Sequence, residues 1–173
     1  MNKLCLSLIV AAVLPTAAHA GWKTYNGRTG WRASIPDNLL EVPYREWAPE
    51  GDPTSPAHIH NTVFWSPDRK VTFTVYTHPR DPAVSLQESF QDNVSRRTKG
   101  NDRINYSVIK DNWFVVSGTN TQGFEFYEKF FMFDDFYVSF DFVYPSSKKA
   151  IYDPMVAKIA RDFIPNLPGV WDH

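Results

Sequence analysis

Aromatic residues recur in long strand-like runs in the second half of this chain. Two such runs, residues 124–133 and 136–144, are separated only by Asp134 and Asp135. In the second run, apolar residues alternate with a more polar set, as expected for a strand whose two faces meet different surroundings. The apolar face holds Phe136, Val138, Phe140 and Phe142; the other holds Tyr137, Ser139, Asp141 and Val143. We therefore predict an antiparallel hairpin with one core face and one face that is wetter or covered by a helix.

Shorter strand-like runs complete the expected sheet. Residues 62–65 and 71–76 flank the turn Ser66-Pro67-Asp68-Arg69, and residues 104–109 and 113–116 precede the aromatic hairpin. Residues 22–25 and 31–35 form a further hairpin across a turn-rich link. Aromatic residues make up 16% of the chain and fall mostly in these runs, which favours a core built on a sheet. The roughly twenty residues that follow Asn38 and lead up to Pro56 are rich in proline, and this proline-rich stretch is expected to be the least structured part of the chain.

Two helices are expected beside the sheet. Ser85 and Glu88 form a capping box, Leu86, Phe90 and Val94 form an apolar stripe, and the helix is expected to end near Gly100. The second helix is expected to start at Asp153-Pro154, with Asp as the cap. Its stripe comprises Met155, Val156, Ile159, Ala160 and Phe163.

The first 20 residues have the organisation of a cleavable signal peptide. Lys3 is followed by an apolar stretch and then by Ala18-His19-Ala20, an A-x-A cleavage site. The apolar stretch is shorter than the roughly 20 residues that cross a bilayer. We therefore expect a periplasmic or secreted protein without a stable membrane anchor, with residues 1–20 as signal peptide and residues 21–173 as a single domain.

Composition excludes several classes of function for that domain. The only cysteine, Cys5, lies in the expected signal peptide, so disulfides, thiolate metal sites and a cysteine nucleophile are excluded. Without Lys3, 17 basic residues face 19 acidic ones, and the basic residues form no stripe, so nucleic acid is not an expected partner. The pairs Arg96-Arg97 and Lys148-Lys149 are interpreted as solvated helix surface.

No motif for catalysis or for a cofactor stands out. His58 and His60, which alternate as on a strand, are the most suggestive metal pattern, with His78 as a third candidate, but no carboxylate has a recognisable ligand spacing to them. Ser117-Gly118 lacks the elbow motif of a nucleophilic serine, and Asp134-Asp135 is interpreted as a turn. We expect no metal and no catalytic residue from these patterns.

Tyr44 and Trp47 are the best candidates for contact with a partner. They lie in the proline-rich stretch, where no strand pattern accounts for them, and exposed aromatic residues are favoured interface anchors. The alternative is that the stretch folds back and that both rings plug the edge of the sandwich.

The chain resembles small exported bacterial proteins with the PsbP-like fold. The resemblance rests on residues 113–118, Phe126-Tyr127-Glu128-Lys129, Tyr144-Pro145 with Lys148, and Tyr152-Asp153-Pro154, and it spans residues 22–163. It implies an α+β domain in which helices flank an antiparallel sheet as an α/β/α sandwich. It also implies a protein that acts by binding, such as an accessory, adaptor or chaperone protein. We therefore expect a non-enzymatic adaptor, chaperone or immunity-type partner of another envelope protein. A hydrolase, or a carrier of a small ligand or metal, remains open.

Overall fold

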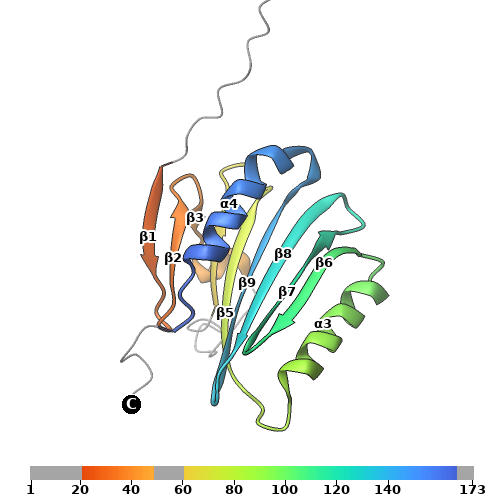
Figure 1. Ribbon diagram of the computed structural model, residues 1–173. Helices are drawn as coiled ribbons and strands as arrows, with labels where there is room; N and C mark the ends of the chain where they lie inside the picture. Colours follow the sequence, from red (N-terminus) through yellow and green to blue (C-terminus); the bar gives the residue numbers. More distant parts are fainter. Residues whose placement is uncertain (1–20, 49–60, 167–173) are drawn as a thin grey trace, which may run out of the picture.

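The computed structural model describes residues 21–48 and 61–166. At its centre lies an antiparallel sheet of seven strands in the order β3-β4-β5-β9-β8-β7-β6 (Figure 1). Its strands are β3 (Leu40–Glu41), β4 (Asn61–Trp65), β5 (Thr72–Pro79), β6 (Arg103–Lys110), β7 (Trp113–Thr119), β8 (Phe124–Met132) and β9 (Phe136–Pro145). A separate hairpin is formed by β1 (Trp22–Asn26) and β2 (Arg32–Pro36). The expected antiparallel sheet is confirmed.

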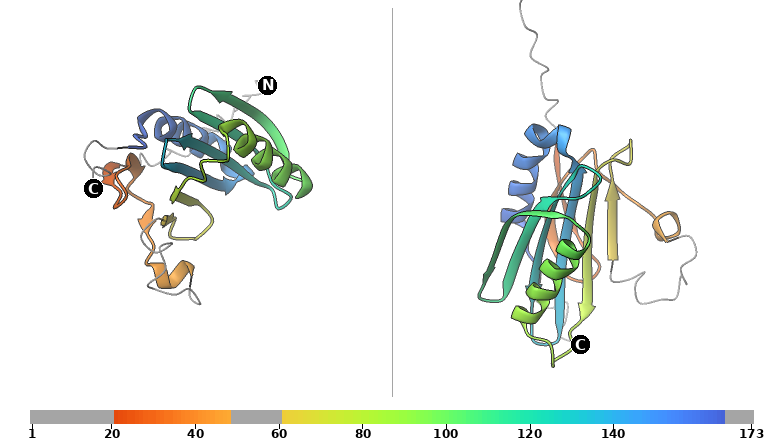
Figure 2. Two further views of the ribbon diagram at one scale, coloured as in Figure 1. Left: turned by 90° about the horizontal axis from the view of Figure 1, so that it is seen from below. Right: turned by 90° about the vertical axis from the view of Figure 1, so that its right-hand side faces the viewer.

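Two long helices cover opposite faces of the sheet, α3 (Leu86–Lys99) and α4 (Lys149–Asp162) (Figure 2). A short helix, α1 (Tyr44–Trp47), stands beside the β3–β4 edge, and a 3-10 turn, η1 (Ser146–Lys148), leads into α4. The α+β sandwich expected from the sequence is therefore confirmed.

The larger core lies between the sheet, α4 and the β1–β2 hairpin. The alternation predicted for β9 is confirmed, because Val138, Phe140 and Phe142 are fully buried on this side. The Phe140 ring lies 4.8 Å from the ring of Phe163, the residue that follows α4, and 5.7 Å from the Phe73 ring of β5. Aromatic burial of this kind supplies the hydrophobic stabilisation that a chain without disulfides needs.

The smaller core lies beneath α3. Leu86, Phe90 and Val94 pack against Phe114 and Phe126 of the sheet, as the stripe predicted. The capping box is also confirmed, since the Ser85 hydroxyl accepts from the Glu88 amide at 3.2 Å and Glu88 accepts from the Ser85 amide at 2.8 Å. Gly100 follows the last residue of the helix, as expected.

The predicted start of α4 at Asp153-Pro154 is wrong, because the helix begins at Lys149 and contains Pro154. The Asp153 carboxylate does not cap the helix; it accepts a hydrogen bond of 2.5 Å from the Tyr144 hydroxyl of β9. The additional first turn is stabilised by Tyr152, which is buried 5.5 Å from the Tyr144 ring. Tertiary packing therefore moves the start of the helix by one turn.

The proline-rich stretch is more structured than expected where it is described. Leu40 and Glu41 pair with Trp65 and Phe64 as strand β3, and α1 follows directly. Within residues 21–48 and 61–166, no helix is long and apolar enough to cross a bilayer.

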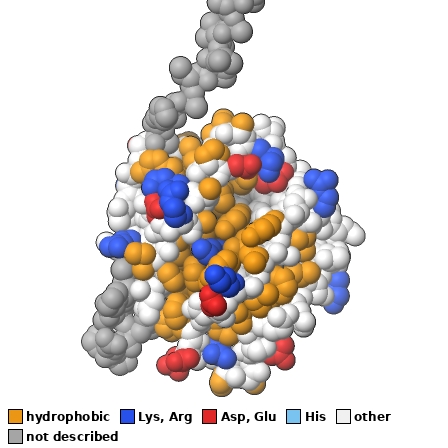
Figure 3. Space-filling model, viewed as in Figure 1, with side chains coloured by type: hydrophobic (Ala, Val, Ile, Leu, Met, Phe, Trp, Pro, Cys, Tyr) orange, Lys and Arg blue, Asp and Glu red, His pale blue; other side chains and the backbone are white. Residues whose placement is uncertain are grey.

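Each long helix covers only part of its face of the sheet. Helix α4 contacts β2, β8 and β9, and hydrophobic side chains remain visible beside it over β8, β7 and β6 (Figure 3). Helix α3 contacts β6 and β7 on the other face. The same face of β5 and β9 is consequently left without a helix above it, and this is where the main cavity lies.

Candidate functional site

A cavity of about 730 Å³ lies between α3 and the uncovered part of the sheet. Small-molecule sites in proteins range over about 300 to 1,000 Å³, so the cavity is large enough for a small organic ligand. The floor is formed by side chains that β5, β9, β8 and β7 direct toward the α3 face: Tyr76, His78, Tyr137, Ser139, Asp141, Glu128, Phe130, Met132 and Phe114.

The opposite wall comes from α3 and from the connection between β5 and α3. Helix α3 contributes Glu88, Ser89, Asp92, Asn93 and Arg96, and the connection contributes Pro79, Arg80, Asp81 and Val84. Asp81, Glu88, Asp92 and Arg96 are exposed, whereas Glu128 and Ser139 on the floor are buried. The cavity thus has a charged mouth and a buried floor.

The floor carries two carboxylates side by side on neighbouring strands. Glu128 of β8 and Asp141 of β9 are direct partners in the antiparallel register, and side chains at such positions lie on the same face about 5 Å apart at Cβ. Glu128 is 7% exposed, and one oxygen of Asp141 is fully buried. Two adjacent buried carboxylates require compensation by hydrogen bonds or cations.

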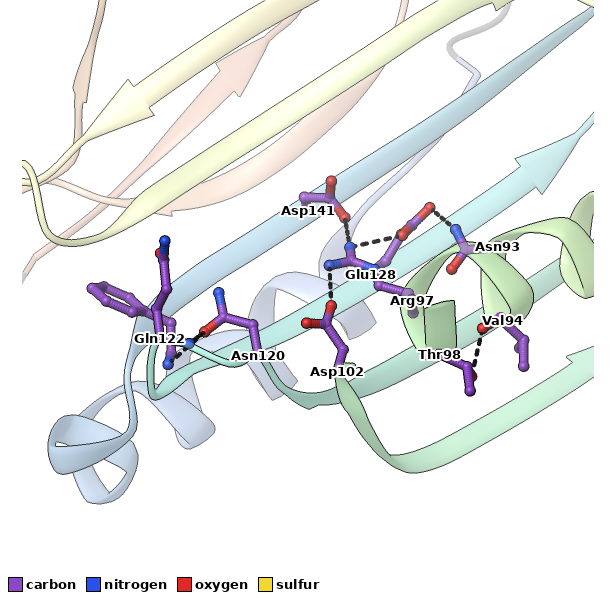
Figure 4. Close-up of polar contacts among 10 residues, drawn as sticks. Asn93, Val94, Arg97, Thr98, Asp102, Asn120, Gln122, Glu128 and Asp141 are labelled. Carbon is purple, nitrogen blue, oxygen red and sulfur yellow. Dashed lines mark hydrogen bonds and ion pairs between the residues drawn. The ribbon is translucent and has the colours of Figure 1, made fainter. Parts of the chain in front are cut away.

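That compensation comes mainly from Arg97 of α3. Its guanidinium lies 3.1 Å from Glu128, 3.5 Å from Asp102 and 3.8 Å from Asp141 (Figure 4). Asn93, one helical turn earlier, donates its amide to the other oxygen of Glu128 at 2.5 Å. One guanidinium therefore serves three carboxylates, with the tightest contact to Glu128 and the loosest to Asp141.

This arrangement raises the pKa of Asp141. Burial raises the pKa of this carboxyl well above its usual range, the neighbouring Glu128 charge raises it further, and Arg97 offsets only part of both effects. Burial also raises the pKa of Tyr76 on the adjacent strand, with a contribution from the Asp141 charge. Elevated carboxyl pKa values in cavities are a recognised mark of functional sites, although structural ion networks produce them too.

Among the described residues, two acceptors of this network lack hydrogen-bond donors, and one donor, the Arg97 Nε, lacks an acceptor. The buried Oδ1 of Asp141 faces Arg97 only at 3.8 Å, which is too long for a hydrogen bond. Asn93, which is 5% exposed, uses its amide nitrogen on Glu128 and leaves its Oδ1 without a donor. Unsatisfied buried polar atoms are rare in native proteins, so these two mark a place where a further donor would be stabilised.

Aromatic rings line the cavity next to the carboxylates. The Phe130 ring stacks at 4.7 Å on Phe114 and at 4.9 Å on Tyr137, which joins β7, β8 and β9 in one row. The Tyr137 ring in turn lies 5.6 Å from His78 of β5. The cavity therefore offers an apolar wall and a polar floor, the combination found in sites for small organic molecules.

The histidine pair suggested by the sequence cannot be placed, because His58 and His60 lie outside the described residues. The third histidine, His78, lies on β5 with its Nε2 3.1 Å from Asn61 Oδ1. Across residues 21–48 and 61–166, no group of three or more His, Cys, Asp or Glu side chains is arranged to hold a metal ion.

Tyr44 and Trp47 lie together on α1, with their rings edge to face at 4.8 Å. Both are half-buried, so neither is a fully exposed anchor nor part of a main core. A small pocket of about 60 Å³ adjoins them, bordered also by Arg28 and Glu41. The two residues are brought together by the helix, but they lie at the edge of the sheet and do not line the large cavity.

The remaining sequence candidates have structural roles. Gly118 lies in β7, next to the bulge in β6. The position requires glycine, because a Cβ there would approach the Arg103 carbonyl oxygen to 2.0 Å. Asp134 and Asp135 are exposed in the β8–β9 turn, as interpreted.

Sequence reasoning missed the cavity residues. The interpretation of Arg97 as solvated surface is wrong, because its side chain is 16% exposed and engaged with carboxylates. A signal was present: Asn93 and Arg97 continue the helical spacing of Leu86 and Phe90, so they lie on the face that packs on the sheet. Glu128 likewise shares its strand face with the buried Phe126 and Phe130.

Comparison with known proteins identifies the fold. The chain is similar to the cyanobacterial PsbP protein of Synechocystis sp. PCC 6803, with a TM-score of 0.61 and 13% identity over 84% of this chain and 93% of that one. It is also similar to a Pseudomonas aeruginosa protein of unknown function, with a TM-score of 0.50 and 9% identity over 84% of this chain and 97% of that one.

A Bacteroides thetaiotaomicron protein matches with a TM-score of 0.50 and 9% identity, over 85% of this chain and 49% of that one. No protein-family model matches the chain, and neither does any curated protein. At these identities the likeness shows the fold alone, and the fold is PsbP-like.

Proposed function

We propose that the chain is an exported, non-catalytic binding protein whose ligand occupies the cavity between α3 and the sheet. The observation that carries the proposal is the cavity itself: about 730 Å³, with an aromatic wall and with two acceptors, on Asp141 and Asn93, that lack donors. A PsbP-like fold is compatible with this role but does not assign it.

The arrangement favours binding over hydrolysis. A hydrolytic serine requires a base within hydrogen-bond reach and a third group that orients the base. Ser89 and Ser139 line the cavity, yet neither side chain forms a hydrogen bond to a histidine or a carboxylate in the described structure. The carboxylates are instead held by Arg97 and Asn93, which is suited to presenting fixed charge to a ligand.

The test is to fill the cavity and follow ligand retention. Ser89→Trp places a large ring into the cavity from α3, and Gln91→Trp is the matched control, because Gln91 is exposed on the same helix and does not line the cavity. Each protein is purified from the envelope fraction, and small molecules released on denaturation are identified by mass spectrometry. We expect one compound in stoichiometric amount with wild type and Gln91→Trp, but not with Ser89→Trp. Equal retention by all three variants would contradict the proposal.

A second candidate function is docking of another envelope or secreted protein through α1. The observation that favours it is the half-exposed pair of Tyr44 and Trp47. Both residues belong to α1, the short helix that stands beside the edge of the sheet (Figure 2). Aromatic pairs of this kind are common anchors at protein interfaces. A pull-down from envelope extract, comparing wild type with Tyr44→Ala/Trp47→Ala, tests it. A stoichiometric protein lost from the double variant supports docking, and identical bands with both baits oppose it.

Export itself is part of the proposal. Strand β1 begins at Trp22, one residue after the expected cleavage point, so cleavage before Gly21 leaves every described element whole. The intact mass of protein from cells expressing the full chain tests this point. A mass corresponding to residues 21–173 in a periplasmic or culture fraction is expected, and an uncleaved chain in the cytosol would contradict it.

A further inference from the structure

The cavity has a negative charge balance along its lining. Five acidic side chains line it: Asp81, Glu88, Asp92, Glu128 and Asp141. Only two arginines do, Arg80 and Arg96. The Arg80 guanidinium donates from Nη1 and Nη2 to the backbone carbonyls of Phe133 and Val84, while its buried Nε has no acceptor among the described residues. Arg97 offsets the two floor carboxylates from behind. The excess of negative charge therefore lies at the mouth, which attracts cations and repels anions.

The floor presents a specific acceptor to such a cation. Asp141 lines the cavity, and its side chain is about a quarter exposed, at 25%. Its closest charged neighbour, Arg97, is also engaged with Glu128 and Asp102 at shorter distances. Asp141 is thus the member of the cluster with the most unused capacity for hydrogen bonding.

A second acceptor, the side-chain oxygen of Asn93, also favours a cationic ligand. The Asn93 Oδ1 is buried, lacks a donor, and belongs to a side chain that borders the cavity. An ammonium group carries three N–H donors and no acceptor, so it can donate to more than one such oxygen. A carboxylate or phosphate ligand would leave both oxygens without donors.

The aromatic side chains that line the cavity indicate what kind of molecule carries the cationic group. Phe130 and Tyr137 stack in the row that borders the cavity, and Tyr76 adds a third ring from β5. Phe130 is stacked between Phe114 and Tyr137, so these rings offer a ligand apolar carbon to pack on rather than a free face for a cation. A bare metal ion would make no use of these rings, whereas an organic cation would use both rings and carboxylate.

From these observations we infer that the ligand is a small organic cation, in which a primary ammonium group contacts Asp141 and an apolar or aromatic body packs on Phe130 and Tyr137. This inference rests on the proposed function, since it names the ligand class for the same cavity. The amine binds reversibly and no covalent step is involved.

The experiment uses three probes of one shape and different charge: phenethylamine, phenethyl alcohol and phenylacetate. Each is titrated into the mature protein and followed by isothermal calorimetry and by NMR shifts of the protein amides. We expect phenethylamine to bind most tightly, with shifts confined to α3, β5, β8 and β9. Asp141→Asn should weaken its binding at least tenfold, whereas Asp134→Asn, in the exposed β8–β9 turn, should leave it unchanged.

The outcomes separate this inference from the proposed function. If the alcohol or phenylacetate binds as tightly as the amine, or if Asp141→Asn keeps the amine affinity, the cationic ligand class is refuted while a ligand cavity remains supported. If none of the probes binds, the cationic class is also refuted, and the retention assay with Ser89→Trp decides the proposed function by itself.

Discussion

Replacing Asp141 with asparagine is expected to stabilise the protein at neutral and alkaline pH. Burial and the Glu128 charge raise the pKa of Asp141 from 3.8 to about 7. A carboxyl whose pKa is higher in the folded state keeps a proton that the unfolded chain has released. Stability therefore falls as pH rises between the two pKa values, and the full loss is present above the folded one.

The size of the effect follows from the pKa difference. One pKa unit corresponds to about 1.4 kcal/mol, so a shift from 3.8 to about 7 sets an upper limit of about 4 kcal/mol. Asp141 is 25% exposed and shares Arg97 with Glu128 and Asp102, which reduces the penalty. We expect Asp141→Asn to raise the free energy of unfolding by about 1 to 2 kcal/mol at about pH 8. At about pH 3, below the unfolded-state pKa of 3.8, the carboxyl is mostly protonated in both states and the substitution should change stability by almost nothing.

Urea denaturation followed by tryptophan fluorescence measures this difference at both pH values. Asp134→Asn, at the exposed β8–β9 turn, is the control and should change stability little at either pH. The charged neighbours Glu128, Arg97 and Arg96 remain in place in both variants. A loss of more than about 1 kcal/mol for Asp141→Asn at about pH 8 would mean that Asp141 is a net stabilising partner of Arg97, and the reasoning would be refuted. A gain in stability combined with a loss of amine binding would be the usual conflict between stability and function.

Three further substitutions test the cores and the backbone. Phe140→Ala should lower the free energy of unfolding by about 3 to 5 kcal/mol, since the ring is fully buried between Phe73 and Phe163. A loss below about 1 kcal/mol by chemical denaturation would show that the core face is misassigned. Ser85→Ala removes the capping box of α3 and should cost about 1 kcal/mol in the same assay, with Gln87→Ala on the first turn as a neutral comparison. Gly118→Ala should lower the free energy of unfolding by about 1 to 3 kcal/mol, because the new methyl group would meet the Arg103 carbonyl. It should also shift the amide resonances of the β6 bulge. A variant as stable as wild type would show that β6 can move away at this position.

Much of the fold was predictable because its signals are local. The alternation in β9, the capping box at Ser85 and the turn at Asp134-Asp135 each depend on a few consecutive residues, and each is found in the structure. The start of α4 was not predictable from its local signal. Asp153-Pro154 has the composition of a helix start, but burial of Tyr152 and the hydrogen bond from Tyr144 extend the helix beyond it.

The candidate site shows where local signals end. The sequence by itself determined that Asp141 points away from the Phe140 face, because strand geometry alternates side chains whatever the rest of the chain does. It also determined the apolar stripe of α3, because helical spacing is equally local. Neither pattern states that β5 lies on the other side of β9 from β8, or where α3 rests on the sheet.

The predicted hairpin across Asp134-Asp135 already places Glu128 beside Asp141. Only the tertiary structure decided that Arg97 of α3 reaches both carboxylates. It also decided that α3 covers β6 and β7 and leaves the cavity open over β5 and β9. The physical reason is that the ion pairs of Arg97 with Glu128 and Asp141 join residues at least 31 positions apart, and such contacts are set by how α3 docks on the sheet.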